Sequence, residues 1–129
     1  MKFHSFLLFL LSLPFMMSCS TASTPQSGQS PPAEEETVVL LHGMGRTQAS
    51  MLVMSKRFKD AGYQTLNFPY NQASRSLDEI SGKLIEFIKE KVKTSRYHLV
   101  AHSLGNVIIR DAFRKEYPPG LGRIVMLAP

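Results

Sequence analysis

Cysteine is almost missing from this sequence: Cys19 is the only one among 129 residues, which excludes an internal disulfide. A stripe of arginines with interleaved aromatic side chains is also missing, although Lys and Arg outnumber Asp and Glu by 15 to 10. Because the basic residues alternate with acidic ones, they are typical of solvated helix faces, and we expect no nucleic-acid partner. No internal repeat is visible, so a solenoid is excluded. The length suits one domain, or part of one.

Long hydrophobic runs are also scarce. The longest, from Phe6 to Met17, follows Lys2 and is broken by a serine and a proline. It is too short to cross ~30 Å of hydrocarbon, which takes about 20 apolar residues. A charged start followed by a short apolar run is typical of a secretory signal peptide, which we place at residues 1–18. A buried helix or a weak anchor is the alternative interpretation.

The signal ends in MMSC, which resembles a bacterial lipobox. This resemblance implies that Cys19 becomes the acylated N-terminus, and each buried CH₂ of an acyl chain adds about 0.8 kcal/mol of membrane affinity. By the same analogy Ser20 favours the outer membrane. We therefore expect an exported protein, lipid-anchored to the bacterial envelope through Cys19 and facing the periplasm. Residues 19–36 are rich in Ser and Pro and are predicted to be a linker.

The remaining residues, 37–129, alternate between short apolar runs and segments with helical periodicity. Predicted strands cover residues 37–42, 63–68, 97–102 and 123–128. Predicted helices cover residues 49–61, a segment capped by Ser76 with Glu79 in a capping box, and residues 104–117. This alternation predicts an α/β fold, with a parallel sheet, flanking helices and an unprotected edge at the last strand.

The stretch YHLVAHSLGN contains the first candidate catalytic residue, Ser103. A nucleophile elbow consists of a strand, a tight G-x-S-x-G turn and a helix, and small flanking residues allow the strained turn to pack. Here the flanks are Ala101 and Gly105, with His102 and Leu104 between them and the serine. The alternative is that Ser103 only caps the helix.

The stretch LLHGMG, at residues 40–45, follows the first predicted strand. An acyl-transfer enzyme stabilises an oxyanion with preorganised N–H donors. Gly43 and Gly45 permit the backbone angles that would aim such a donor from this loop. The alternatives are a glycine-rich turn without a role and a phosphate cradle, although the later glycine and lysine of phosphate loops are missing.

Taken together, HGMGRT and AHSLG resemble the bacterial lipase/esterase-like alpha/beta hydrolases, and the resemblance covers nearly all of residues 37–129. It implies a serine esterase or lipase that acts on carboxylic esters, often lipids, without a metal or organic cofactor. It also implies that the N–H groups of Met44 and Leu104 form the oxyanion hole, that His42 supports the loop and that His102 is the variable residue of the elbow. Asn106 stands where the family commonly has glycine, and we expect this to change little.

No histidine follows Ser103, although the family order is Ser, then Asp or Glu, then His. Asp111 and Glu116 do follow it, but both fall on the predicted elbow helix rather than at a strand end. We therefore expect a nucleophile and an oxyanion hole without the triad acid and base. This pattern suggests the N-terminal half of a hydrolase, from a truncated gene, a frameshift or an incomplete sequence, with negligible activity of its own.

Two further interpretations stay open at this point. A non-catalytic lipoprotein could keep the half-fold as a binding module. An acyltransferase would use the same serine chemistry but pass the acyl group to an acceptor other than water.

Overall fold

In this computed structural model the described residues are 35–129. The predicted signal peptide, Cys19 and nearly all of the predicted linker lie outside the described residues. The elements are β1 (Thr37–Leu41), the 3-10 helix η1 (Gln48–Met51), α1 (Leu52–Asp60), β2 (Gln64–Asn67), α2 (Leu77–Lys91), β3 (Tyr97–His102), α3 (Leu104–Ala112) and β4 (Leu121–Leu127).

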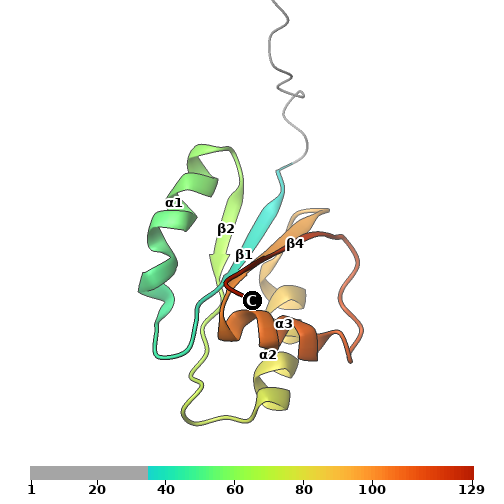
Figure 1. Ribbon diagram of the computed structural model, residues 1–129. Coiled ribbons are helices and arrows are strands. Elements are labelled where there is room, and N and C mark those ends of the chain that lie inside the picture. Colours follow the sequence, from blue (N-terminus) through green and yellow to red (C-terminus); the bar gives the residue numbers. More distant parts are fainter. Residues whose placement is uncertain (1–34) are drawn as a thin grey trace, which may run out of the picture.

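The four strands form one parallel sheet in the order β2-β1-β3-β4, which confirms the predicted fold class (Figure 1). β1 lies inside the sheet, where Val39 pairs with Leu66 on one side and Leu99 on the other. β2 and β4 lie at the two edges of this sheet, so the last strand is at an edge, as predicted. The carboxyl ends of β1 and β3 therefore lie side by side, so the loops that follow them meet at one end of the sheet.

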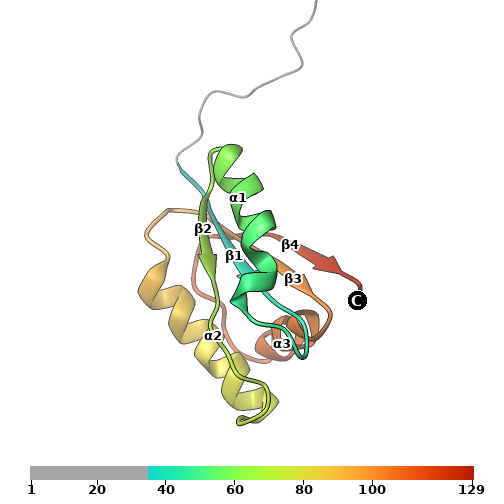
Figure 2. The ribbon, with the colours of Figure 1, turned by 90° about the vertical axis from the view of Figure 1, so that its left-hand side faces the viewer.

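Helices cover both faces of the sheet: α1 lies on one face, and α2 and α3 lie on the other (Figures 1 and 2). Successive side chains of a strand point to opposite faces, so each buried strand contributes to two cores. The larger core contains Val39 and Leu99 of the sheet, packed with Leu84 of α2 and Ile109 of α3. Continuous apolar runs in β1 and β3 are the consequence of this burial on both faces.

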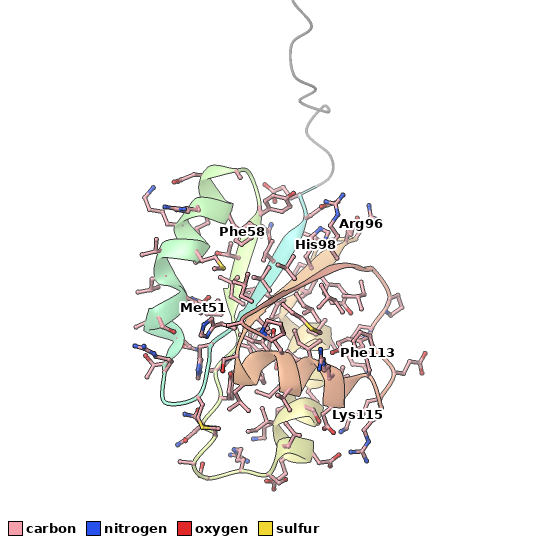
Figure 3. The ribbon with its side chains drawn as sticks, viewed as in Figure 1. Met51, Phe58, Arg96, His98, Phe113 and Lys115 are labelled. Atoms are coloured by element: carbon pink, nitrogen blue, oxygen red, sulfur yellow. The ribbon has the colours of Figure 1, made fainter. Side chains whose placement is uncertain are left out.

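The smaller core lies under α1. There Met51 and the partly buried Phe58 pack against Val38, Leu40 and Val100 (Figure 3). Among residues 35–129, no helix combines the length and the apolar character that crossing a membrane requires.

Helix boundaries differ from the prediction in two places. The segment expected as one helix at 49–61 is divided into η1 and α1. The helix expected at 104–117 ends at Ala112, because the chain turns there and the Tyr117 hydroxyl donates to the Ile109 carbonyl at 2.9 Å. Glu116 is therefore not on the helix. The capping box of Ser76 and Glu79 is confirmed at the start of α2.

Candidate active site

Ser103 occupies a strained turn between β3 and α3. Its backbone angles are φ 49° and ψ −115°, in a region that L residues with a side chain rarely adopt. Such conformations cost about 1–3 kcal/mol and persist where the surrounding structure enforces them, often at functional sites. Ser103 precedes the helix, but its side chain makes no capping hydrogen bond, contrary to the alternative of a plain N-cap. Its side chain is exposed.

The turn is closely packed at its small flanking residues. Ala101 is completely buried, and Gly105 lies against Leu41 at the end of β1. A Cβ on Gly105 would come within 2.9 Å of the Leu41 Cβ and 3.1 Å of the Ala101 Cβ. No side chain larger than hydrogen therefore fits at this position unless the strand and helix move apart.

The elbow is also tied to β4. The Ser103 N–H and the Asn106 side-chain amide both donate to the Leu127 carbonyl, at 3.0 and 2.8 Å. The Asn106 N–H donates in turn to the Ser103 carbonyl at 2.8 Å. Asn106 was expected to change little, but its side chain is 2% exposed and holds the elbow against the edge strand, which a glycine could not do.

The loop after β1 makes a turn in which the Arg46 N–H donates to the Gly43 carbonyl at 3.2 Å. Gly45, its third residue, has φ 65°. This is the position at which a type II turn requires a positive φ, so glycine is favoured there. Met44, the second residue, projects into solvent with 69% of its surface exposed.

This loop lies directly against the elbow. A Cβ on Gly43 would lie 2.8 Å from His102 Nδ1 and 3.3 Å from the Ser103 Cβ. Within the described part of the chain, the N–H groups of Met44 and Leu104 have no hydrogen-bond acceptor. The structure thus brings together Ser103, Gly43 and His102, and leaves two donors free on the segments that carry them.

His42 is held in place by an aromatic partner that sequence reasoning missed. Its ring is 2% exposed and is stacked on Tyr70, with ring centres 4.1 Å apart and planes 1° apart. His42 Nδ1 bonds to the Gly43 carbonyl at 2.9 Å, and the Tyr70 hydroxyl donates to the His42 carbonyl. Burial raises the pKa of Tyr70 to about 12, so this hydroxyl keeps its proton at neutral pH.

Three histidines lie in residues 35–129, and none hydrogen-bonds to the Ser103 hydroxyl. His98 lies near the amino end of β3 (Figure 3), where its Nε2 bonds to Glu36 at 2.7 Å and its Nδ1 accepts from the Arg123 N–H at 2.8 Å. Glu36 was placed in the predicted linker, and its contact with His98 joins it to the sheet. The His98 bond is the main cause that lowers the pKa of Glu36.

Asp111, one of the carboxylates that follow Ser103, is used to join two helices. It accepts from the Ser81 hydroxyl at 2.6 Å and from Arg114 at 2.9 Å, with Lys115 beside both Ser81 and Asp78 (Figure 3). The Ser81 hydrogen bond is the largest cause that lowers the pKa of Asp111. The prediction that Asp111 lies on the elbow helix, away from a strand end, is confirmed.

A groove of about 920 Å³ opens beside the loop after β1. Residues of that loop, of the segment after β2 and of the first turns of α2 line it: His42, Gly45, Arg46, Thr47, Gln48, Ala49, Pro69, Tyr70, Asn71, Gln72, Arg75, Ile80 and Lys83. Four residues of the segment after β2, to which the sequence alone assigned no role, form one wall: Tyr70, Asn71, Gln72 and Arg75. No set of three or more His, Cys, Asp or Glu side chains suited to a metal ion occurs in residues 35–129.

Comparison with solved structures identifies the fold. An extracellular alpha/beta-hydrolase from a Paenibacillus species superimposes with a TM-score of 0.61 and 22% sequence identity, over 70% of this chain and 39% of its own. The described domain has part of the alpha/beta-hydrolase fold. The Paenibacillus hydrolase is described as sharing structural and functional homology with tobacco salicylic acid binding protein 2.

This chain spans about two fifths of that hydrolase's length, as the 39% coverage shows. No protein-family model matches the chain, and no curated protein matches it. The alpha/beta-hydrolase assignment therefore rests on the architecture. In that architecture the turn at Ser103 and the loop at Gly43 lie at the carboxyl ends of adjacent strands.

Proposed function

We propose that this domain carries the nucleophile and oxyanion hole of a serine hydrolase that acts on carboxylic esters. The observation that carries the proposal is the backbone of Ser103, whose positive φ presents an exposed hydroxyl beside the Gly43 loop. Strain of this kind at an exposed polar residue is a feature of nucleophile elbows. The free N–H groups of Met44 and Leu104 are the proposed oxyanion donors.

In the proposed reaction the Ser103 oxygen forms a bond to the ester carbonyl carbon, and the negative charge that develops on the carbonyl oxygen is stabilised by the two N–H groups. The C–O bond to the alcohol then breaks, and the alcohol takes the proton that a general base has removed from Ser103. Water cleaves the acyl-serine by the reverse sequence. The base would be a histidine after Ser103 in the usual order, and these 129 residues contain none there.

We therefore expect the isolated 129-residue polypeptide to show negligible esterase activity. A folded enzyme without its triad base retains about 10³–10⁴-fold catalysis over water from the oxyanion hole and binding, which is far below a complete site. The measurement is hydrolysis of a short-chain chromogenic ester by the purified polypeptide and by its Ser103→Ala variant. Turnover above background that the variant abolishes would contradict this expectation.

The decisive experiment for the function uses the product of the native gene in its own cells. A fluorophosphonate probe reacts with an activated serine, so we expect mass spectrometry to find the probe on the peptide that contains Ser103. A Ser103→Ala strain is the control. If the native product is present and unlabelled, the serine is not activated. The protein would then be interpreted as a non-catalytic binding module rather than a hydrolase. Labelling combined with acyl transfer to an added alcohol in preference to water would indicate an acyltransferase.

We further propose that the protein is exported and anchored to the envelope through an acylated Cys19. The support is the signal-like start of the sequence and MMSC, together with the extracellular location of the Paenibacillus hydrolase. Replacement of Cys19 by alanine should move the protein from the membrane fraction to the periplasmic fraction, and unchanged membrane association would disprove the anchor.

A further inference from the structure

The groove beside the proposed oxyanion loop is strongly cationic. Arg46 from the loop after β1, Arg75 just before α2 and Lys83 on α2 all line it, and no aspartate or glutamate of residues 35–129 does. None of these three side chains forms an ion pair with a carboxylate in that range. Three cations thus lie around one cavity of ligand size, and none of them is neutralised by a direct ion pair with a carboxylate of residues 35–129.

Glu79 is the carboxylate that these cations influence. Its pKa is lowered first by hydrogen bonds from the Ser76 backbone and hydroxyl, and further by the positive charges of Arg75 and Lys83. Because Glu79 is bound in the capping box of α2, it offsets part of the positive charge without closing the groove. The net charge around the cavity is therefore positive.

The walls of the groove are braced. Gln48 donates from its side-chain amide to the Asn67 carbonyl at 3.2 Å, which connects the segment after β1 to the end of β2. The stacked pair of His42 and Tyr70 fixes the same two segments to each other. A cavity whose walls are already fixed loses little conformational entropy when a ligand binds.

One loop serves both the groove and the proposed catalytic turn. His42 and Gly45 line the groove, whereas Gly43 between them lies against Ser103. A ligand in the groove would therefore lie next to the segment that carries the Met44 N–H. A substrate whose ester group lies at Ser103 could therefore place a charged part of the same molecule in the groove.

We propose that the groove binds a phosphate group carried by the ester substrate, so that the hydrolase acts on acyl esters with a phosphorylated alcohol part. Two guanidinium groups and an ammonium group match this chemistry, because arginine forms paired hydrogen bonds with phosphate and lysine adds a point charge. The inference rests on the proposed function for its connection to ester cleavage. The phosphate recognition itself depends only on the groove.

The test measures binding by the purified full chain, without any turnover. Octyl phosphate is compared with octyl glucoside, a neutral amphiphile with the same alkyl chain, and with inorganic phosphate, each by calorimetric titration below its micellar concentration. We expect octyl phosphate to bind, octyl glucoside to bind at least about tenfold more weakly, and added salt to weaken octyl phosphate binding because exposed charges are screened.

Variants locate the site. Arg46→Gln and Arg75→Gln should each weaken octyl phosphate binding by about tenfold, as expected for the loss of a charged hydrogen bond. Arg57→Gln is the matched control, because Arg57 is an exposed arginine of α1 outside the groove, and it should bind like the parent. Thermal unfolding checks that each variant is folded.

Three results would overturn the proposal: equal binding of octyl phosphate and octyl glucoside, an equal loss in Arg57→Gln, or inorganic phosphate binding as tightly as octyl phosphate. The last would indicate a site for free phosphate rather than for a substrate headgroup. Fluorophosphonate labelling tests the proposed hydrolase function independently of phosphate binding. Phosphate binding without labelling of Ser103 would disprove the proposed hydrolase function and support the phosphate site. Labelling of Ser103 without phosphate binding would disprove only the phosphate site.

Discussion

At the scale of single residues, Ser103, the proposed nucleophile, has a backbone conformation that costs stability. Its φ of 49° is unfavourable for any residue with a Cβ, and its hydroxyl contributes no capping bond in return. Glycine adopts such angles without steric penalty, although it loses more backbone freedom on folding. The strain should therefore be measurable as a gain in stability when the side chain is removed.

We expect Ser103→Gly to raise the free energy of unfolding by about 1 kcal/mol, the difference between a strain of about 1–3 kcal/mol and the entropic cost of glycine. Ser103→Ala keeps the Cβ and should stay within about 0.5 kcal/mol of the parent. Urea unfolding followed by circular dichroism measures both. Equal stabilities of the glycine and alanine variants would mean that the turn stores no strain.

At the scale of elements, close approach decides which glycines are replaceable. Gly105 in α3 lies against Leu41 of β1, whereas a Cβ on Gly82 in α2 would meet only the end of Lys115, at 3.8 Å. Both glycines are in helices. They therefore form a matched pair: replacement by alanine favours the helix at both positions, but only Gly105 lacks room for a methyl group.

We expect Gly105→Ala to lower the free energy of unfolding by about 1–3 kcal/mol, because a methyl group would force α3 away from β1. Gly82→Ala should raise it by about 0.5–1 kcal/mol, since alanine is the better helix former and has room. Chemical denaturation of both variants gives the two values. Stabilisation by Gly105→Ala would show that the elbow is not closely packed.

Elements were also the scale at which the sequence was most informative. The apolar runs at 37–41 and 97–102 predicted strands, because strands buried on both faces are apolar throughout rather than alternating between apolar and polar residues. The small flanks of Ser103 predicted a closely packed turn between strand and helix, and the contact of Gly105 with Leu41 gives the steric reason. The end of α3 was missed, because the bond from Tyr117 to Ile109 forms only after the chain has turned back.

The groove could not be predicted in the same way. Its cations belong to segments far apart in the sequence, and no local pattern indicates that Arg46 and Arg75 line one cavity. The stacking of Tyr70 on His42 was missed for the same reason, since it depends on the pairing of β1 with β2. Sequence periodicity specifies which face a residue occupies, but not which loops meet beyond the strand ends.

At the scale of the whole molecule, a hydrogen bond joins α2 to α3 and an ion pair joins α2 to the segment that follows α3, and the two helices are separated in the sequence by β3. Asp111 on α3 receives the Ser81 hydroxyl of α2, and Lys115 extends the same cluster to Asp78. The hydrogen bond from Ser81 is the first cause that lowers the pKa of Asp111 below its ordinary value of 3.8, and the bond from Arg114 lowers it further. A carboxylate with a lowered pKa stabilises the folded state only while it is ionised.

The stability that Asp111 contributes should therefore be complete above the unfolded pKa of 3.8 and should be lost as the pH falls through the lower pKa of the folded state. Asp111→Asn should reduce stability at neutral pH and flatten the decline of stability below about pH 4. Thermal unfolding between neutral and acid pH measures this. Asp60→Asn, which removes an exposed pair with Lys56 on α1, is the control and should change stability at neutral pH by less than Asp111→Asn, because exposed ion pairs contribute little.

The Leu127 carbonyl has a consequence for the order in which the domain is made. It accepts both bonds that hold the elbow to β4, yet it follows Ser103 by the whole of α3 and most of the last strand. The chain is made from its N-terminus, so β3 and the serine are synthesised before their acceptor. The strained turn therefore takes its final shape late, and the growing chain passes through a stage in which Ser103 is present but not yet locked in place.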